Sequence, residues 1–190
     1  GVACGEKNIL FTNNDSAYET AISLIQKGIN IEAIIDIREE VESKLIYEVE
    51  KNNIKIFKGY TITDTFGYKR INKISIKQLS KDGQKVLGSS INLSCDCLGV
   101  SGGWTPAVHL YTQSGGKLKF RDEDQTFIPN TYTPDQLSIG ACNGDFTLDE
   151  ILDNTPNSLK EFLNIKKTEY DELEILSSTN KLKRNIWLLP

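Results

Sequence analysis

The segment from Asn8 to Arg38 places the strongest constraint on how this chain can fold. Its pattern predicts a strand at Asn8 to Thr12, a tight turn, an amphipathic helix that Gly28 ends, and a second strand. The second strand begins with the nearly continuous apolar run Ile31 to Ile35, which is typical of a strand buried on both faces of a parallel sheet. Two parallel strands joined by a helix make a right-handed βαβ unit, so the segment predicts a Rossmann-like sheet.

The turn of this βαβ unit lacks the glycines of a dinucleotide-binding site. A G-x-G-x-x-G motif lets the backbone approach a pyrophosphate, whereas this turn reads Thr-Asn-Asn-Asp-Ser-Ala from Thr12. Asn13 and Asn14 tolerate positive φ and can replace glycine, which keeps both as weak candidates for cofactor binding. Asp15 opposes that role, because a carboxylate that caps the helix occupies the amides a phosphate would use and repels its charge. A nucleotide contact and a structural cap both remain open, and the cap is favoured.

Asp36 ends the predicted second strand, 21 residues after Asp15. In a Rossmann unit an acid at this spacing binds a ribose 2′-hydroxyl. The competing interpretation is a solvent-exposed aspartate at a strand end, facing Arg38. The residues alone do not separate the two, so Asp36 is kept as a weak cofactor-binding candidate.

The pattern changes in the next sixty residues. Glu40 to Asn52 has helical spacing, and Ile54 to Phe57 resumes strand character. Period-two alternation then recurs in residues 60–64, 71–79 and 90–93, which predicts an antiparallel meander, and residues 96–101 return to the buried parallel type. The predicted fold class is therefore α/β, a Rossmann-like parallel sheet interrupted by an antiparallel β-meander, as in proteins with two dinucleotide-binding domains.

A second strand, turn and helix is predicted towards the C-terminus. Leu137 to Ala141 has strand character, and Phe146 to Leu152 starts a helix. The turn between them is lined by small residues, namely Gly140, Ala141, Cys142, Asn143 and Gly144. This turn is the better candidate for a close approach to phosphate. The alternative is a close packing contact between the helix and the strand.

Composition excludes several classes of function. The net charge is −4 and the basic residues lie scattered among acidic ones, so the footprint of a nucleic-acid-binding protein is missing. No apolar run approaches the ~20 residues that span a bilayer, and no signal-peptide pattern is present, so no membrane association and a cytoplasmic location are expected. Methionine is absent, even at position 1, which suggests a piece of a longer polypeptide.

The remaining chemically interesting side chains favour structural roles. The four cysteines, Cys4, Cys95, Cys97 and Cys142, lack the spacing of a metal site and are predicted to be buried or half-buried thiols. His109, the only histidine, has no nucleophile placed beside it. Trp104 is predicted to anchor a domain interface. No catalytic residue and no metal ligand are predicted.

Four blocks of sequence, in order, carry a resemblance to a known family. They are TNNDSAY from Thr12, IIDIR from Ile34, CDCLGVSGGWTPAVHLYTQSGGKL from Cys95 and IGACNGDF from Ile139. With these blocks the chain resembles the alpha subunit of heterotetrameric sarcosine oxidase, a member of the glutathione reductase-like superfamily. The closing WLLP at Trp187 to Pro190 is similar to the start of that family's folate-binding half.

The resemblance implies three regions. Residues 1–100 would be an inserted Rossmann-like domain of the pyridine nucleotide type. Residues 101–155 would be the return of the chain into a first nucleotide-binding domain, and residues 156–190 a linker or arm towards a missing aminomethyltransferase-like, folate-binding domain. The glycine motif of the first nucleotide domain would precede Gly1.

The resemblance also implies an activity and its cofactors. The family's whole enzyme oxidatively demethylates sarcosine to glycine and passes the one-carbon unit to tetrahydrofolate. NAD is held by the alpha subunit, while FAD and FMN lie elsewhere in the complex, so the partners would be the other subunits of a heterotetramer. The contacts that carry over are Gly140 to Gly144 with Phe146 and Leu148. Glutathione reductase-like relatives have an aspartate in this turn. This chain has Ala141 and Cys142 there, which argues against flavin binding at the turn.

Two alternatives stay open at this stage. The chain could be a non-catalytic assembly module, in which a degenerate Rossmann domain offers a packing surface to partner subunits. It could also be part of a related amine or opine dehydrogenase with the same two-domain plan. As a piece of a sarcosine oxidase-like subunit, the isolated fragment would hold no cofactor and would be inactive.

Overall fold

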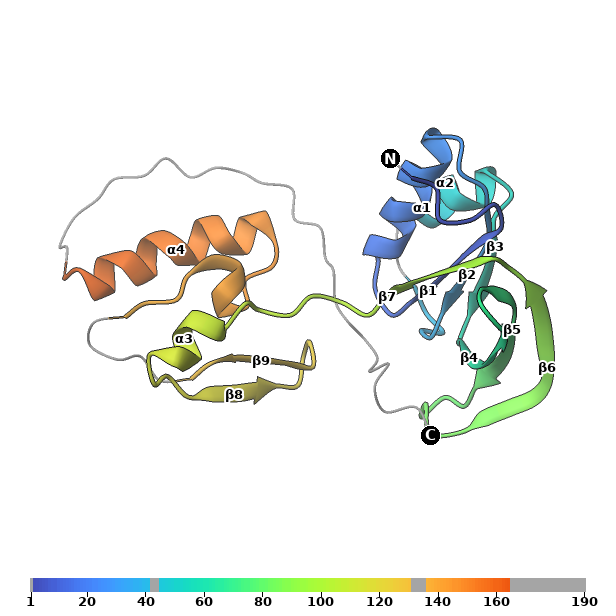
Figure 1. Ribbon diagram of the computed structural model, residues 1–190. Helices are drawn as coiled ribbons and strands as arrows, with labels where there is room; N and C mark the ends of the chain where they lie inside the picture. Colours follow the sequence, from blue (N-terminus) through green and yellow to red (C-terminus); the bar gives the residue numbers. More distant parts are fainter. Residues whose placement is uncertain (1, 42–44, 131–135, 165–190) are drawn as a thin grey trace. The chain divides into compact units, whose positions relative to one another are not determined.

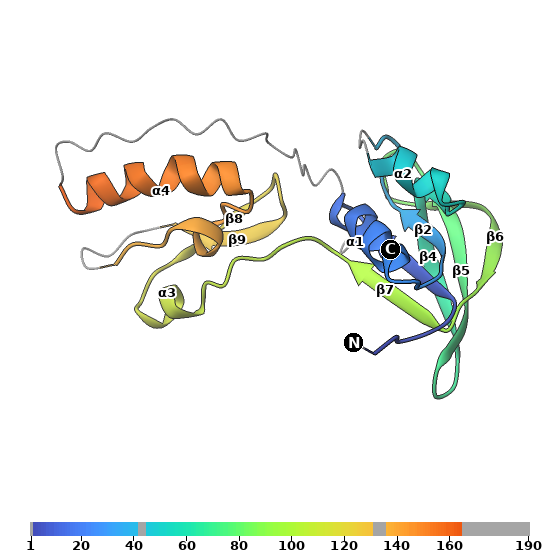
Figure 2. The same ribbon diagram turned by 90° about the horizontal axis from the view of Figure 1, so that it is seen from above.

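The computed structural model describes residues 2–41, 45–130 and 136–164. These residues form two compact units, an N-terminal unit up to Gly103 and a C-terminal unit that starts at Trp104. Figures 1 and 2 show the helices and strands of each unit.

The N-terminal unit is built on a parallel sheet of four strands. These are β1 (Asn8–Thr12), β2 (Ile31–Asp36), β3 (Lys55–Lys58) and β7 (Cys97–Ser101), in the order β3-β2-β1-β7. Helix α1 (Ser16–Gln26) connects β1 to β2, and α2 (Leu45–Lys51) precedes β3. The predicted first strand is confirmed residue for residue, and the second strand ends at Asp36 as predicted.

The parallel sheet lies between two layers. Helices α1 and α2 cover one face, where Leu10 and Ile34 pack with Tyr18, Ala21 and Val49 (Figure 1). The antiparallel meander covers the other face. It consists of β4 (Tyr60–Gly67), β5 (Ile71–Leu79) and β6 (Val86–Ser94), in the order β4-β5-β6.

The meander is attached to the sheet by its apolar side chains. Ile74 and Ile76 of β5 are fully buried and pack against Ile9, Phe11 and Ile35 of the parallel sheet. Successive strand residues point to opposite faces, so Ile9 and Phe11 face the meander while Leu10 faces the helices. The predicted fold class, an α/β Rossmann-like sheet with an antiparallel meander, is confirmed.

The C-terminal unit is smaller and has less regular structure. It contains α3 (His109–Gln113), the hairpin β8 (Leu118–Arg121) and β9 (Thr126–Pro129), a 3₁₀ turn η1 (Gly140–Asn143), and α4 (Leu148–Phe162). Tyr111 of α3 is buried and donates a hydrogen bond to the Lys117 carbonyl, which fixes the helix to the start of the hairpin.

Three sequence-based boundaries differ from the structure. The strand predicted at Leu137 to Ala141 does not form, because Gly140 has a φ of +65°, a left-handed conformation that cannot continue a strand. The second helix starts at Leu45 rather than Glu40, with residues 42–44 outside the described part of the chain. Residues 156–162, predicted to begin a linker, continue α4 despite Pro156, and residues 165–190 of that predicted arm lie outside the described residues.

The cysteines also differ from expectation. Cys95 is buried and Cys97 is half-buried, whereas Cys4 and Cys142 are exposed, and all four are free thiols. Burial raises the pKa of the Cys95 and Cys97 thiols above the ordinary cysteine value, which keeps both protonated and weakly nucleophilic at neutral pH. No helix among residues 2–41, 45–130 and 136–164 is long and apolar enough to span a membrane.

Candidate functional site

The carboxyl ends of three parallel strands meet at one edge of the N-terminal unit's sheet. Thr12 of β1 is paired in register with Asp36 of β2 on one side and with Ser101 of β7 on the other. In open parallel sheets, ligands bind in the crevice beyond this edge. The structure therefore brings the predicted candidates Asn13, Asn14 and Asp36 together at the position where a Rossmann domain would hold a dinucleotide.

The turn above β1 is closed by its own side chains. Asn14 is the centre of the closure, because its Nδ2 donates to the Ser101 carbonyl (3.1 Å) and to the Asn13 Oδ1 (2.9 Å). Its Oδ1 accepts from the Ser16 backbone amide at 3.0 Å, at the first residue of α1. Asn13 and Asn14 are each only 4% exposed. The amide that a phosphate would reach first is thus already hydrogen-bonded to the chain itself.

Asp15 does not cap α1 with its side chain, contrary to the interpretation that the sequence favours. It occupies the N-cap position, but its backbone is helical (φ −78°, ψ −17°) and its side chain makes no capping hydrogen bond. Its carboxylate instead forms an ion pair with Arg38, with 2.8 Å between Oδ1 and Nη1. The helical backbone at Asp15 turns the carboxylate away from the helix amides, and Asn14 takes over the capping role.

Asp36 is fully buried, so the alternative of a solvent-exposed aspartate is wrong, although Asp36 does face Arg38 as that alternative expected. Arg38 Nη2 donates to its Oδ2 at 2.7 Å and Arg38 Nε to its Oδ1 at 3.0 Å. The Tyr18 hydroxyl, from α1, donates to Oδ2 at 2.9 Å. Both carboxylate oxygens are therefore engaged, and a ribose hydroxyl would have to displace Arg38 or Tyr18 to reach them.

Arg38 joins the two acids into one buried cluster, here called the Asp15–Arg38–Asp36 network. Burial by itself would lower the pKa of the guanidinium, but hydrogen bonds and charge from Asp36 and Asp15 outweigh it and raise the pKa above the ordinary value. Burial also raises the pKa of the Tyr18 phenol well above its ordinary value, and the negative charge of Asp36 adds to the shift. Arg38 therefore stays charged and Tyr18 stays a hydrogen-bond donor at any physiological pH.

The Asp15–Arg38–Asp36 network does not fit a dinucleotide. A pyrophosphate needs open amides and a positive or neutral surrounding, whereas this edge offers occupied amides and two carboxylates that share one cation. The proposed contacts of Asn13, Asn14 and Asp36 with a nucleotide stay predictions, and the geometry of the folded turn disfavours them.

The second predicted site lies in the C-terminal unit. The 3₁₀ turn η1 leads into Gly144, whose φ of +91° is left-handed, and the Gly144 carbonyl accepts from Arg121 Nη2 at 2.7 Å. Arg121 is held in turn by an ion pair with Asp124 on the β8–β9 hairpin. Ala141 and Cys142 are exposed on the turn, so small side chains do line it as the sequence predicts.

The helix that follows this turn has its own capping residues. Thr147 is the N-cap of α4, and its hydroxyl accepts from the Glu150 amide, while the Glu150 carboxylate accepts from the amides of Phe146 and Thr147 at 3.1 Å. This is a capping box. Asp149 adds a second negative charge, and the Thr147 hydroxyl holds the pKa of that carboxyl below its ordinary value. The N-terminus of α4 is therefore a poor phosphate site as folded.

The other two predicted contacts follow the same turn. Phe146 is half-buried, and Leu148, the first residue of α4, is 62% exposed. Their roles in cofactor binding stay predictions.

Asp145 is the residue that the sequence reading missed. It follows Gly144 directly and is 9% exposed, and its Oδ1 accepts from Asn154 Nδ2 at 2.9 Å, which ties the turn to α4. The signal was the Gly144-Asp145 pair near the end of the block IGACNGDF, which places the acid of this turn after its last glycine. The objection drawn from Ala141 and Cys142 is therefore weakened, because the turn does carry an aspartate.

Comparison with known structures establishes the fold. Thioredoxin reductase from T. acidophilum aligns with a TM-score of 0.59 at 17% identity, over 83% of this chain and 52% of that one. The HOCl-induced flavoprotein disulfide reductase RclA from Escherichia coli aligns with a TM-score of 0.56 at 12% identity, over 84% of this chain and 36% of that one. The chain thus has the fold of the glutathione reductase-like, FAD- and NAD(P)-dependent disulfide oxidoreductases.

Sequence comparison gives a closer relationship. Sarcosine oxidase subunit alpha from Corynebacterium sp. (strain P-1) is 30% identical over 148 residues, 77% of this chain and 15% of that subunit. The subunit from Rhizobium meliloti (strain 1021) is 27% identical over 143 residues, 75% of this chain and 13% of that subunit. No protein-family model matches. The resemblance is confirmed: this chain is similar to a segment of the sarcosine oxidase alpha subunit, and spans about one seventh of its length.

We expect Arg38→Ala to lower the free energy of unfolding by about 3–5 kcal/mol, because it leaves two buried carboxylates without a counter-charge. Arg70→Ala removes an exposed guanidinium from the same unit and should cost less than about 1 kcal/mol. Urea denaturation followed by circular dichroism measures both. Equal effects of the two substitutions would show that the network does not hold the sheet edge.

Tyr18 makes stability depend on pH in the alkaline range. The folded-state pKa of its phenol is raised from an ordinary value of 10.0, so above pH 10 the unfolded chain loses this proton while the folded chain keeps it. The stabilisation is complete below pH 10 and is lost as pH rises towards the folded pKa, with a slope of up to about 1.4 kcal/mol per pH unit. Tyr18→Phe should remove this component from denaturation curves measured between pH 9 and 11, a range of about one unit either side of the ordinary tyrosine pKa of 10.0. An unchanged slope would contradict it.

Gly144 and Gly115 form a matched pair, because both have a φ of +91°. A Cβ at Gly144 would lie 2.8 Å from Ile128 Cγ2 and 2.9 Å from Arg121 Nη2, whereas a Cβ at Gly115 meets nothing within 4 Å. Gly115→Ala should therefore cost about 1–2 kcal/mol from backbone strain alone. Gly144→Ala should cost about 1–3 kcal/mol more from overpacking. Thermal unfolding of the two variants compares them, and equal costs would contradict the packing of this turn.

Proposed function

We propose that this chain is part of the alpha subunit of a sarcosine oxidase-like enzyme, which oxidatively demethylates sarcosine to glycine and transfers the one-carbon unit to tetrahydrofolate. The similarity to named sarcosine oxidase alpha subunits over about three quarters of the chain carries the proposal. The fold also supports it. Helices cover one face of the Rossmann-like sheet and the meander covers the other, and flavoprotein oxidoreductases share this fold.

The N-terminal unit serves in this proposal as a scaffold and not as a nucleotide site. Its strand-end crevice is filled by the Asp15–Arg38–Asp36 network, and its first helix amide is bound by Asn14. A fold can persist after its original ligand site is lost, because the packing of the sheet does not depend on the ligand. The amine-oxidising flavin, FAD or FMN, and the folate site would lie on other parts of the complex.

The C-terminal unit contributes one edge of the NAD site in the whole subunit. Support comes from the small residues Ala141 and Cys142, which are exposed on this turn. NAD, when bound, supplies a nicotinamide that exchanges hydride. The backbone of the turn would come close to the cofactor, and residues outside this chain would complete the site. The isolated chain is expected to hold no cofactor and to be inactive.

The proposed setting is a cytoplasmic heterotetramer with the other subunits of the oxidase. Affinity purification of the natural protein that carries this sequence, with an antibody against the chain, tests the assignment. We expect sarcosine-dependent formation of hydrogen peroxide and copurification of partner subunits. Natural protein that gives neither would contradict the proposal, and oxidation of a different amine would point to the dehydrogenase alternative.

Calorimetry with NAD tests the scaffold role of the N-terminal unit. We expect no binding of NAD to the 190-residue chain. If the chain binds NAD, if Asp36→Asn weakens that binding by about tenfold or more, and if the exposed control Glu50→Gln does not, then the strand-end crevice is a nucleotide site. That outcome would overturn the scaffold role while leaving the relationship to the alpha subunit intact.

A further inference from the structure

The scatter of charge along the chain has one exception, which is the β4–β5 hairpin. Residues 65–81 contain four lysines and one arginine and no acidic residue, although the whole chain has a net charge of −4. These basic residues are Lys69, Arg70, Lys73, Lys77 and Lys81. A local excess of one sign of charge attracts groups of the opposite sign. The hairpin is therefore suited to an acidic partner, unlike the rest of the chain.

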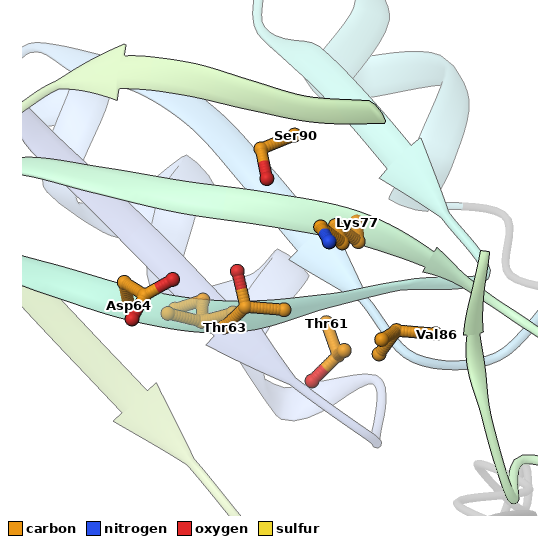
Figure 3. Close-up of a pocket in the computed structure, with 7 residues that line it drawn as sticks. Thr61, Thr63, Asp64, Lys77, Val86 and Ser90 are labelled. Atoms are coloured by element: carbon orange, nitrogen blue, oxygen red, sulfur yellow. The ribbon is translucent and has the colours of Figure 1, made fainter. Parts of the chain in front are cut away.

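The excess of positive charge is greatest at the loop end of the hairpin. Ile74 and Ile76 of β5 are buried in the core, so Lys73 and Lys77, which alternate with them, lie on the other face of the meander. Asp64 and Lys77 line one pocket in that face, so the carboxylate offsets the charge of this lysine (Figure 3). Between Asp64 and the loop the sequence has no further acid.

The loop itself is tight and holds its side chains in fixed positions. Tyr68, Lys69 and Arg70 connect the two strands and are exposed, while Gly67 and Ile71 pair with each other across the hairpin. Gly67 has a φ of +142°, and a Cβ there would lie 2.0 Å from the Arg70 carbonyl oxygen. A loop with so little conformational freedom loses little entropy when it binds a partner.

Two aromatic side chains stand among the cations. Phe66 is directly opposite Lys73 in the β4–β5 register, and Lys73 Nζ lies 4.0 Å from the centre of its ring. This ring face is therefore occupied by the ammonium group. Tyr68 is 97% exposed and offers its whole ring to a partner. Tyrosine and arginine are enriched at the centres of protein interfaces, where they bury much of their surface.

The cations of the loop end are not neutralised by ion pairs of their own. Neither Lys69 nor Lys73 takes part in an ion pair with any residue that the structure describes. Arg70 has a partial counter-charge, because Asp96 lies near it. Hydrogen bonds from the amides of Glu6 and Lys7 lower the pKa of Asp96, and the charge of Arg70 adds to this shift. Lys69, at the exposed centre of the loop, keeps its full charge for a partner.

We propose that the loop end of this hairpin docks on an acidic surface of a partner protein. The basic hairpin end, as we call it, consists of Phe66, Tyr68, Lys69, Arg70 and Lys73. Its cations meet carboxylates of the partner, and the Tyr68 ring packs on an apolar side chain between them. A nucleic acid is disfavoured, since base stacking needs open rings and Lys73 covers Phe66. The proposal rests on the meander alone and holds whether or not the chain belongs to an oxidase.

The experiment uses the octapeptide Glu-Glu-Glu-Leu-Leu-Glu-Glu-Glu as the probe and follows the amide resonances of the ¹⁵N-labelled chain. We expect saturable shifts at residues 66–73, with a Kd on the order of 0.1–1 mM at an ionic strength of about 0.05 M. The Kd should rise about tenfold at an ionic strength of about 0.5 M, because salt screens exposed charges. The same peptide with glutamine in place of glutamate should cause no shifts.

Substitutions with matched controls locate the contact. Lys69→Gln and Lys73→Gln should each weaken binding about two- to fivefold, the range for exposed ion pairs, and together about tenfold. Lys27→Gln removes an exposed charge at the end of α1 and should leave the Kd unchanged. Tyr68→Ala should weaken binding about fivefold, whereas Tyr47→Ala, which truncates a 72% exposed tyrosine on α2, should have no effect.

Three results would overturn the proposal. They are the absence of saturable shifts at residues 66–73, equal effects of the hairpin substitutions and their controls, and tighter binding of a different polyanion at the same residues. For the last, decathymidylate represents a nucleic acid and phosphatidylserine vesicles represent an anionic membrane. The spectrum of each variant also reports whether it is folded, so a loss of binding is not confused with a loss of structure.

Discussion

The buried guanidinium of Arg38 is the interaction on which the architecture of the sheet edge depends. It binds Asp15 at the start of α1 and Asp36 at the end of β2, and so adds an ionic link beside the backbone hydrogen bond that Ile37 donates to Thr12. Without it, two carboxylates would be buried side by side, and their desolvation and repulsion would oppose folding. Tyr18 completes the arrangement from within α1, so helix and strand are joined by hydrogen bonds as well as by apolar packing.

The same interaction decides what the strand-end crevice can do. A dinucleotide-binding Rossmann domain leaves this edge open and brings its own cation or glycines to meet phosphate. Here the chain supplies both the anion and the cation, and Asn14 satisfies the helix amide. The charged groups and the helix amide at this edge are therefore paired within the chain and need no ligand. This explains how a unit can keep the fold of pyridine nucleotide-dependent enzymes while serving, as proposed, as a scaffold within a larger subunit.

The two faces of the meander differ in character. Its inner face is apolar and closely packed, with Ile74 and Ile76 buried against the parallel sheet. Its other face is polar and carries a pocket lined by threonines, Asp64 and Lys77 (Figure 3). Period two places both sets of side chains on the same strands, so a segment that the core needs for packing can also present polar groups to solvent.

The sequence by itself determined the order and type of most elements in the N-terminal unit. The strand Asn8 to Thr12, the apolar run from Ile31 and the alternation in 71–79 are local patterns, set by which neighbours along the chain share a face. Four blocks of sequence likewise carried the resemblance to the oxidase subunit, which the sequence comparison confirms. Tertiary structure alone decided that Asp15 pairs with Arg38 and that Asp36 is buried. Those outcomes depend on side chains from different strands and helices that meet only after the sheet has formed, and no local pattern encodes them. Gly140 failed as a strand residue for a related reason, since its left-handed backbone is imposed by the turn and not by its apolar neighbours.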